Sequence, residues 1–463
     1  MHHKKVTRSD INAVTDYLSL EELAYGVFAT QAVNVGIRLE LFEHIAKGTL
    51  KESLIKPRPM EMLLAVYRAM ELLDQHDHIY QYVRGALVWS GPNSLGVYLD
   101  SLDDLWESAR KGDKKAMFKL ALAGPQNLDF LRTPKQKFVY GISSTAAIIF
   151  AHKYGLFKTL ANGPITPHVI AEKAQIEFDE AESLLAFLVE LGLLEKKGKE
   201  KISLRADLVP YLVKGNNYYH GPVLDIISAP WNTTRTKDLI TAIEKDAPII
   251  SDNIWKVYMN DYEADIAFQN HMFCVSWPAG VKIAKMIDFH KSKRILDIAA
   301  GQGGITIPIL ARHPHLTATL TEITRTDIVK QKALEYGVLG RMSLVNADMF
   351  TDPIPTGSDV VILSQILNDW SVEKNVSLLK KVFNALQPGG RILIHERLLL
   401  DDQSGPLLTA LQNIFMLMWS EGRQYSAQEI RLMLLEAHFK ITSIKPTIGG
   451  FSIIEAEKND LKA

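Results

Sequence analysis

From about residue 285 onwards, short runs rich in β-branched residues alternate with amphipathic stretches. The runs are "RILDI", "TATLTE", "SLVNAD", "DVVILS" and "RILIHE", and the stretches include "TDIVKQKALEYG" and "EKNVSLLKKVFNALQPGG". Strand–helix alternation of this kind predicts an α/β, doubly wound, Rossmann-like domain with a parallel sheet between two layers of helices. Ligands of such sheets bind at the carboxyl ends of the strands. The residues that follow each run are therefore the first candidates for a functional site.

The first run leads into a loop of small residues, "DIAAGQGG" at 297–304, which can bring bare backbone close to a ligand. A phosphate-binding P-loop requires a second glycine and a lysine after Gly301, but Thr306 and Ile307 stand at those positions. A dinucleotide fingerprint would also need its third glycine at Thr306. Neither phosphate-binding pattern is met, so the loop favours another class of ligand.

Acidic residues stand at the ends of three successive runs, at Asp297, Glu322 and Asp348. A carboxylate at Asp297, close to Gly301 and Gly303, would repel a pyrophosphate but would suit the cationic amino-acid end of S-adenosylmethionine. Glu322 can accept hydrogen bonds from both ribose hydroxyls, and Asp348 can accept one from the adenine amino group. The pattern predicts S-adenosylmethionine as the cofactor, with no metal.

An internal similarity links two parts of the N-terminal half of the chain. "YGVFATQA", from Tyr25, resembles "YGISSTAA", from Tyr140, and at the same offset of 115 residues "LFEHIA" resembles "LFKTLA". After a gap of six residues, "LLAVYRAMELL" at 63–73 resembles "LLAFLVELGLL" at 184–194. Three matches in one order indicate a duplicated helical module. The second copy continues into "EKKGKEKI", which predicts a helix–turn–helix followed by a β-wing, the winged-helix pattern.

These patterns predict a helical, degenerate winged-helix module at 1–115, a winged-helix dimerisation module at 137–215 and the α/β domain at 250–463. A winged helix also raises the hypothesis of a DNA-binding regulator that senses a small molecule. A helix that reads DNA should carry basic residues for phosphates, whereas the helix predicted within 180–194 has three glutamates and no lysine or arginine. Dimerisation is therefore the preferred interpretation of these modules.

The overall composition argues against several classes of partner and compartment. The chain has 52 basic and 53 acidic residues, so no general field draws it to nucleic acid or to an anionic membrane. Its one cysteine, Cys274, rules out an internal disulfide framework and fits a reducing compartment. No apolar run is long enough to span a bilayer, and the basic N-terminus has no apolar segment behind it. We therefore expect a cytoplasmic protein.

The C-terminal half resembles the family of class I caffeate and bacterial small-molecule O-methyltransferases. The resemblance runs from "FQNHMFCVSW" at 268 to "GGFSIIEAEK" at 458, and its motifs include "ADMF" and "LQPGGRILIHE". Ala299 replaces the first glycine of the family's glycine motif. The resemblance implies a homodimer and an S-adenosylmethionine site. It adds Met349, Ser276 and Ser364 to the cofactor-binding residues.

Two residues depart from the family in a way that concerns mechanism. Asn368 stands where the family has the histidine that deprotonates a phenol, and Gln424 replaces a glutamate that orients this histidine, while Glu396 retains the other orienting acid. An amide cannot take up a proton but can hold an acceptor by hydrogen bonding. We therefore assign Asn368, Glu396 and Gln424 to positioning of the acceptor, with Asp369 and Trp370 supporting their loop.

The missing histidine leaves four mechanisms open. The acceptor can already be ionised or carry a free lone pair, or it can be an activated carbon. Another histidine, His271 or His395, can act as the base. Finally, the cofactor can be retained for a reaction other than methylation.

The resemblance also places an acceptor pocket along "NIFMLMWSEG" and the helix before the glycine loop. Its expected lining residues are Met272, Phe415, Met416 and Trp419. A stripe of methionine and aromatic residues at helical spacing can equally be ordinary core. The predicted function is methylation of a small, aromatic or polyketide- or peptide-like specialised metabolite. The alternatives are C- or N-methylation, a non-methylating reaction, a winged-helix sensor, or a binding protein without activity.

Overall fold

The computed structural model describes residues 18–50, 55–79, 95–123, 141–198, 200–229, 235–249, 254–323 and 327–458. Tyr140, which begins the second sequence repeat, lies outside these residues. The chain divides into two compact units. We call residues 253–401 and 420–463 the sheet unit, and residues 17–252 and 402–419 the helical unit.

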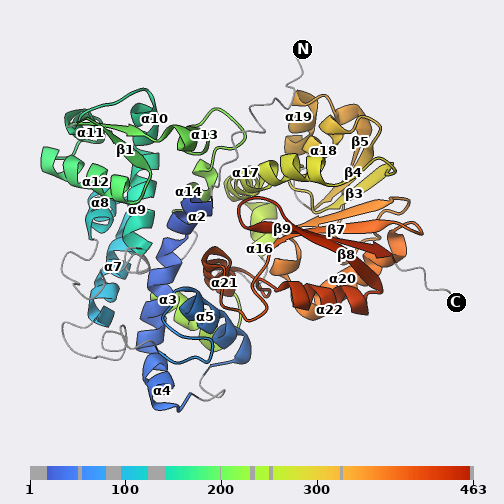
Figure 1. Cartoon of the computed structure of the whole chain (residues 1–463), viewed down its shortest axis with the longest axis horizontal. Helices are drawn as coiled ribbons and strands as arrows, with labels where there is room; N and C mark the ends of the chain where they lie inside the picture. Colours follow the sequence, from blue (N-terminus) through green and yellow to red (C-terminus); the bar gives the residue numbers. More distant parts are fainter. Residues whose placement is uncertain are drawn as a thin grey trace. The chain divides into compact units, whose positions relative to one another are not determined.

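The sheet unit contains seven strands in the order β5-β4-β3-β6-β7-β9-β8. The first five in this order are parallel, and β9 and β8 add an antiparallel hairpin at one edge (Figure 1). This arrangement confirms the predicted α/β, Rossmann-like fold. The strands are β3 Arg294–Ile298, β4 Thr317–Glu322, β5 Met342–Asn346, β6 Val360–Ser364, β7 Arg391–Arg397, β8 Phe439–Pro446 and β9 Phe451–Lys458.

Helices cover the two faces of this sheet, with α18 and α19 on one side and α20 and α22 on the other (Figure 1). Alternate residues of the strands, such as Leu296 and Ile394, are buried in one core with Leu379 of α20 and Leu434 of α22. This spacing of two follows from the alternation of side chains along a strand. The helices are α16 Ile254–Asn260, α17 Tyr262–Met286, α18 Thr306–Arg312, α19 Asp327–Glu335, α20 Val372–Ala385 and α22 Ala427–Glu436, with 3-10 turns η4 Leu339–Arg341 and η5 Leu367–Asp369.

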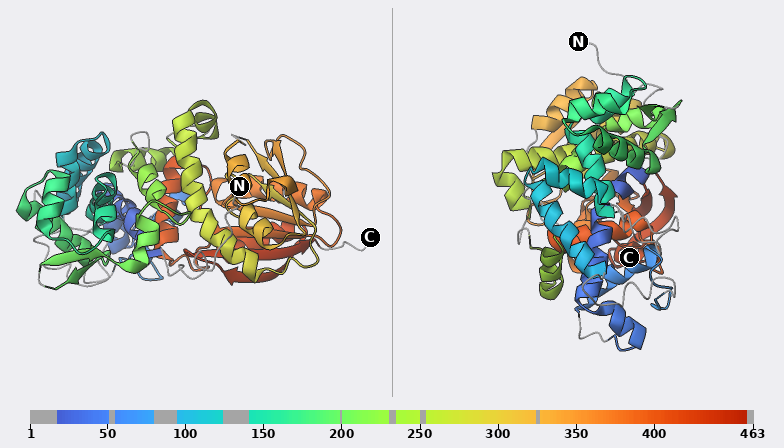
Figure 2. Two further views of the ribbon diagram at one scale, coloured as in Figure 1. Left: turned by 90° about the horizontal axis from the view of Figure 1, so that it is seen from above. Right: turned by 90° about the vertical axis from the view of Figure 1, so that its left-hand side faces the viewer.

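The helical unit contains one small sheet among its described residues, the antiparallel pair β1 Leu194–Lys197 and β2 Lys201–Leu204 (Figure 2). No described helix of the chain is both long enough and apolar enough to cross a membrane. The helices of this unit are α2 Leu18–Ala24, α3 Gly26–Arg38, α4 Leu41–Lys47, α5 Pro57–Ala69, α7 Leu95–Arg110, α8 Lys114–Leu122, α9 Gly141–Lys153, α10 Leu156–Ala161, α11 Pro167–Ala174, α12 Phe178–Glu190, α13 Val209–Leu212, α14 Gly221–Ile227, α15 Thr236–Lys245 and α21 Leu407–Trp419, with a 3-10 turn η3 Ala206–Leu208.

The second repeat has the expected winged-helix order. Helices α11 and α12 are joined by a short turn, and the β1–β2 hairpin follows directly. A capping box begins α12, in which Glu177 and Glu180 each accept a hydrogen bond from the other's backbone N–H. Among the described residues of the first repeat, a bridge between Leu73 and Ile79 follows the equivalent helix.

The two sequence repeats have similar local backbone conformations. Glu40 and Gly155, which are 115 residues apart, both adopt the left-handed conformation at the start of α4 and α10. Helices α5 and α12 both have 13 residues. Each is followed by a residue with positive φ, Glu71 and Gly192, at equivalent positions. The sequence similarity therefore reflects a similarity of local structure.

One segment does not follow the predicted domain boundaries. Helix α21 falls within the expected domain at 250–463, but residues 402–419 form part of the helical unit. The reason is its apolar surface, since the ring of Phe415 packs edge-on against Tyr25 and Phe28, with centroids 6.2 and 5.6 Å away. Hydrophobic periodicity marks such a face, but it does not identify what covers it.

Candidate active site

The loop after β3 is held against helix α17 by close backbone contact. A Cβ atom on Gly280 of α17 would lie 2.2 Å from the carbonyl oxygen of Gly304, and one on Gly304 would lie 2.8 Å from the Cβ of Ser276. Only glycine allows this approach. Ala299 has a φ of 53°, so the backbone keeps the left-handed conformation where the related family has glycine.

Glu322 joins the glycine loop to the end of β4. One of its carboxylate oxygens accepts a hydrogen bond from the backbone N–H of Gly301 at 2.8 Å, and the other accepts one from Ile323 at 2.8 Å. The side chain is 8% exposed. These bonds fix the carboxylate beside the loop, where the sequence predicts a ribose ligand.

Asp348 lies just after β5 and is half-buried. Its carboxylate accepts a hydrogen bond from the backbone N–H of Phe350 at 2.8 Å, and its neighbour Met349 packs on the core of the sheet unit. Since β3, β4 and β5 are adjacent and parallel, their carboxyl ends meet at one edge of the sheet. The structure therefore brings Asp297, Glu322 and Asp348 to the same edge.

Asp297 is the most deeply buried of these carboxyl groups, at 2% exposure. It accepts a hydrogen bond from the hydroxyl of Thr306 at 2.6 Å. Burial raises the pKa of Asp297 to about 7; the hydroxyl of Thr306 opposes this rise, and the charge of Glu322 adds to it. A carboxyl group in this setting would gain from a cationic partner.

We expect the pKa of Asp297 to make stability depend on pH. Between about pH 4 and pH 7, Asp297 keeps its proton in the folded protein. In the unfolded chain, where an aspartate has a pKa of about 3.9, the proton has already been released. The free energy of unfolding should therefore fall as pH rises from about 4 to 7, by at most about 1.4 kcal/mol per pH unit from this group. Urea unfolding across this range should show a smaller fall for Asp297→Asn. Parallel curves for parent and variant would contradict the assignment.

Ser276, Met272 and Ser364 take different places around the loop. The hydroxyl of Ser276, on α17, accepts a hydrogen bond from Gln365 at 3.2 Å, and Met272 is half-buried one turn earlier on the same helix. The hydroxyl of Ser364 lies 3.0 Å from Nδ1 of His395. Gln365 was not expected from the sequence. Its φ of 56° lies in the left-handed region, which a glycine would have suggested but a glutamine does not.

The surroundings of His395 are those of a residue packed in the core. It is fully buried, stacks on Phe451 at 4.7 Å and has its Nε2 3.2 Å from the hydroxyl of Thr447. Burial lowers the pKa of His395 to about 3, with the charge of Arg397 adding to the effect. Such a weak base favours packing over proton transfer. His271, whose carbonyl accepts a hydrogen bond from Cys274, stays a hypothesis.

Glu396 supports the short turn that carries Asn368. Its carboxylate accepts hydrogen bonds from the backbone N–H groups of Ile366 and Leu367, both at 2.9 Å, and it is 3% exposed. Burial raises the pKa of Glu396 to about 8 against these bonds. Asn368 follows in η5, and its side-chain oxygen is buried with no hydrogen-bond partner among the described residues.

The segment that contains Gln424 packs on the same turn. A Cβ atom on Gly422 would lie 2.2 Å from the carbonyl oxygen of Asn368. The hydroxyl of Tyr425 donates a hydrogen bond to the carbonyl of Trp370 at 2.6 Å. Burial also raises the pKa of Asp369, to about 8. The structure thus brings together the turn of Asn368, its support Glu396 and the buried Gln424.

Phe415, Met416 and Trp419 belong to the helical unit rather than the sheet unit. Met416 and Trp419 are buried, and the ring of Phe415 lies 4.4 Å from that of Trp419. These contacts are those of a core helix. Their role in acceptor binding stays a prediction.

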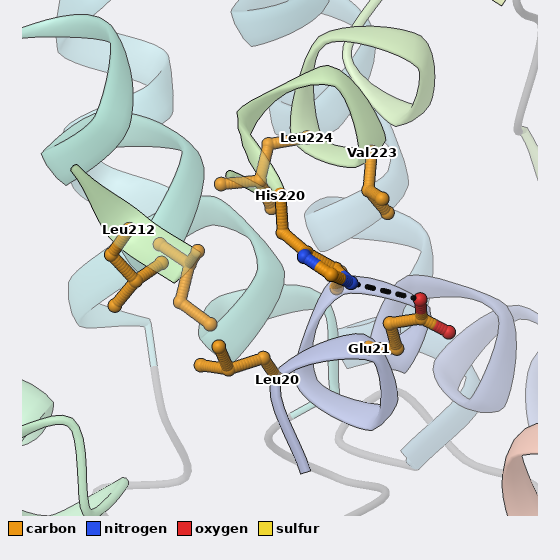
Figure 3. A pocket seen from close by; sticks show the side chains of 8 residues that line it. Leu20, Glu21, Leu212, His220, Val223 and Leu224 are labelled. Atoms are coloured by element: carbon orange, nitrogen blue, oxygen red, sulfur yellow. Dashed lines mark ion pairs between the residues drawn. The ribbon is translucent and has the colours of Figure 1, made fainter. Parts of the chain in front are cut away.

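A small cavity in the helical unit carries a buried polar pair that the sequence did not reveal (Figure 3). Nε2 of His220 lies 3.4 Å from the carboxylate of Glu21, and both side chains are almost fully buried. Nδ1 of His220 lies 2.7 Å from the carbonyl of Tyr218. The remaining lining is apolar and consists of Leu20, Ala24, Ile148, Leu212, Val223 and Leu224. The pair links α2 to the residue that precedes α14, which is far away in the sequence.

Comparison with known proteins identifies the family. A model described as an O-methyltransferase domain matches residues 245–440. The 3-hydroxy-5-methyl-1-naphthoate 3-O-methyltransferase of Streptomyces sahachiroi is 31% identical over 304 residues, which cover 64% of this chain and 86% of that protein. The L-tyrosine C(3)-methyltransferase of Streptomyces lavendulae is 32% identical over 150 residues, which cover 32% of this chain and 41% of that protein.

Comparison with solved structures also finds a methyltransferase fold. The crystal structure of human N-acetylserotonin methyltransferase in complex with S-adenosylmethionine matches with a TM-score of 0.60 and 22% identity, over 70% of this chain and 96% of that one. At this identity the likeness concerns the fold. The naphthoate enzyme from Streptomyces sahachiroi is matched in sequence over most of its length, so the relationship does not rest on the fold alone. The chain belongs to the O-methyltransferase family.

Proposed function

We propose that this methyltransferase transfers a methyl group from S-adenosylmethionine to a small, planar aromatic metabolite. The observation that carries the proposal is the carboxylate of Glu322, which is held by Gly301 and Ile323 at the edge where Asp297 and Asp348 also lie. The relative from Streptomyces sahachiroi, whose name gives a hydroxylated naphthoate as its acceptor, supports an aromatic substrate.

The residues at this edge fit the cofactor. The loop at Gly301 and Gly303 offers backbone without side chains, and the buried Asp297 would pair with an amino group. Glu322 and Asp348 would accept hydrogen bonds from ribose and adenine. Ser276, Ser364 and Met349 complete the proposed set. Bound S-adenosylmethionine supplies an electrophilic methyl group on its sulfonium sulfur.

Asn368 positions the acceptor in this proposal. Its buried side-chain oxygen, unpartnered among the described residues, can accept a hydrogen bond from a hydroxyl or amine. Glu396 and Gln424 act through the turn that carries it. Because an amide takes up no proton, catalysis rests on alignment of the nucleophile with the methyl group. This favours an acceptor that is ionised, has a free lone pair or is an activated carbon. O-, N- and C-methylation and a non-methylating reaction are all consistent with such a site.

We expect Asn368→Ala to lower the turnover number only modestly, by roughly tenfold, which is the worth of one hydrogen bond of about 1 kcal/mol and some loss of orientation. Removal of a general base would cost about 10²- to 10⁴-fold instead. Steady-state kinetics with the identified acceptor distinguish the two. A loss of several orders of magnitude would show that Asn368 takes part in proton transfer.

The proposed function is tested by calorimetric titration with S-adenosylmethionine and with S-adenosylhomocysteine. Micromolar binding of both supports it, and a screen of hydroxylated and aminated aromatics by mass spectrometry should then reveal a gain of one methyl group. Absence of binding by a protein free of copurified cofactor would overturn the proposal.

The resemblance also implies a homodimer. That implication assumes that the helical modules find their partners in a second chain, and the contacts of α3 with α9 bear on this assumption. A cytoplasmic location is supported by the presence of one cysteine in the sequence, Cys274, which fits a reducing compartment.

A further inference from the structure

Helices α3 and α9 occupy the same place in the two repeats and pack directly on each other. Gly26 of α3 and Gly141 of α9 are equivalent residues, 115 positions apart. A Cβ atom on Gly26 would lie 2.8 Å from the carbonyl oxygen of Gly141, and one on Gly141 would lie 2.1 Å from that of Gly26. The helices therefore cross backbone to backbone at a position that they share.

Two reciprocal hydrogen bonds surround this crossing. The backbone N–H of Val27 donates to the hydroxyl of Thr145 at 3.0 Å, and the N–H of Ile142 donates to the hydroxyl of Thr30 at 3.0 Å. Val27 is equivalent to Ile142, and Thr30 to Thr145, at the same offset. A contact in which i meets j and j meets i is the mark of two-fold symmetry, as in the interface of a symmetric dimer.

The contact leaves these helices no free face. Residues 26–36 of α3 and 141–151 of α9 are all buried. A helix that is apolar and buried all round lies in a core and has no surface for another chain. A second copy of the protein could reach the face around Gly141 only by displacing α3.

The size of the chain agrees with an added module. The human methyltransferase structure is matched over 96% of its own length but over only 70% of this chain. The fold of that protein therefore leaves about three tenths of this chain without a counterpart.

We propose that the first repeat is a built-in partner of the second. The chain forms within itself the two-fold contact that two copies of a single-repeat chain would form between them, and it is a monomer. The first repeat also supports α21, because its Tyr25 and Phe28 pack on Phe415. The built-in partner thus holds the helix that carries three of the predicted acceptor-binding residues.

The first test is the mass of the full-length protein in solution. Sedimentation and light scattering over about a hundredfold range of concentration should give the mass of one chain, 51.9 kDa, throughout. The melting temperature should not depend on concentration, because no association accompanies folding. A mass of two chains, or a melting temperature that rises with concentration, would overturn the proposal.

Conservative variants test the contact itself. Thr30→Val and Thr145→Val each keep the side-chain shape but leave one buried backbone N–H without its acceptor. We expect each to lower the melting temperature by roughly 2 to 10 °C at every concentration. The hydroxyl of Thr145 also donates a hydrogen bond to the carbonyl of Leu23 at 2.9 Å, so Thr145→Val loses this bond as well. Thr241→Val, whose hydroxyl bonds only to the carbonyl of its own helix at Lys237, is the matched control. If both variants melt like this control, the reciprocal contact is absent.

Discussion

Glu322→Gln should weaken the binding of S-adenosylmethionine and of S-adenosylhomocysteine by roughly 10- to 100-fold. The amide retains one acceptor oxygen, whereas the carboxylate uses one oxygen for Gly301 and the other for Ile323. A hydrogen bond to a charged group is worth about 1.5–3 kcal/mol, and each 1.4 kcal/mol is tenfold in affinity. Isothermal titration calorimetry of both ligands provides the measurement.

The matched control for this variant is Glu457→Gln, which neutralises an exposed carboxylate on β9 of the same unit. It should bind both ligands as the parent does. Because one backbone N–H loses its acceptor, the melting temperature of Glu322→Gln without ligand should fall by roughly 2 to 10 °C. Titration well below this temperature separates a binding defect from unfolding. Equal affinities of Glu322→Gln and the parent would remove Glu322 from the cofactor site.

Glu396→Ala should impair both stability and turnover. It removes the acceptor of the buried N–H groups of Ile366 and Leu367. Two unsatisfied groups cost about 1–3 kcal/mol each, so the free energy of unfolding should fall by roughly 2–6 kcal/mol. The turn that carries Asn368 also loses its support, and a misplacement of about 1 Å can cost 10²-fold in rate.

Glu396→Gln keeps an acceptor oxygen at the same place and should retain most of the stability and the activity. Urea unfolding and steady-state kinetics at fixed pH give the comparison, with cofactor affinity by calorimetry unchanged in both variants. A positioning role requires the turnover number to fall far more in Glu396→Ala than in Glu396→Gln. Equal losses in the two would contradict the positioning role of Glu396.

The sheet, and the edge at which three acidic residues meet, could be predicted because they depend on local pattern. β-branched runs mark the strands, and the carboxyl ends of adjacent parallel strands must meet, so Asp297, Glu322 and Asp348 could be grouped in advance. The pairing of Glu322 with Gly301 could not, because it depends on the rotamer and loop conformation that form after the strands assemble. The place of Gln365 could not be predicted for a related reason, since its left-handed backbone is imposed by its surroundings.

In the helical unit the local structure could be predicted, but the packing of its helices could not. Sequence similarity at a fixed offset revealed the repeat, but not that its two copies would pack on each other through Gly26 and Gly141. Similarity states that two segments fold alike and leaves their partners open. For the same reason, the apolar residues of α21 were assigned to an acceptor pocket, although the packing of Phe415 on Tyr25 and Phe28 accounts for one of them as core.

Joining both halves of a two-fold contact in one gene changes how the contact can evolve. In an assembly of identical subunits every substitution appears on both sides of the axis, so a change that suits only one side is penalised on the other. Here Thr30 and Thr145 are encoded by separate codons, so the two sides of the contact can change independently of each other. The wings already show this divergence, since one repeat has the β1–β2 hairpin, whereas in the other the described residues, which stop at Ile79, form a bridge between Leu73 and Ile79.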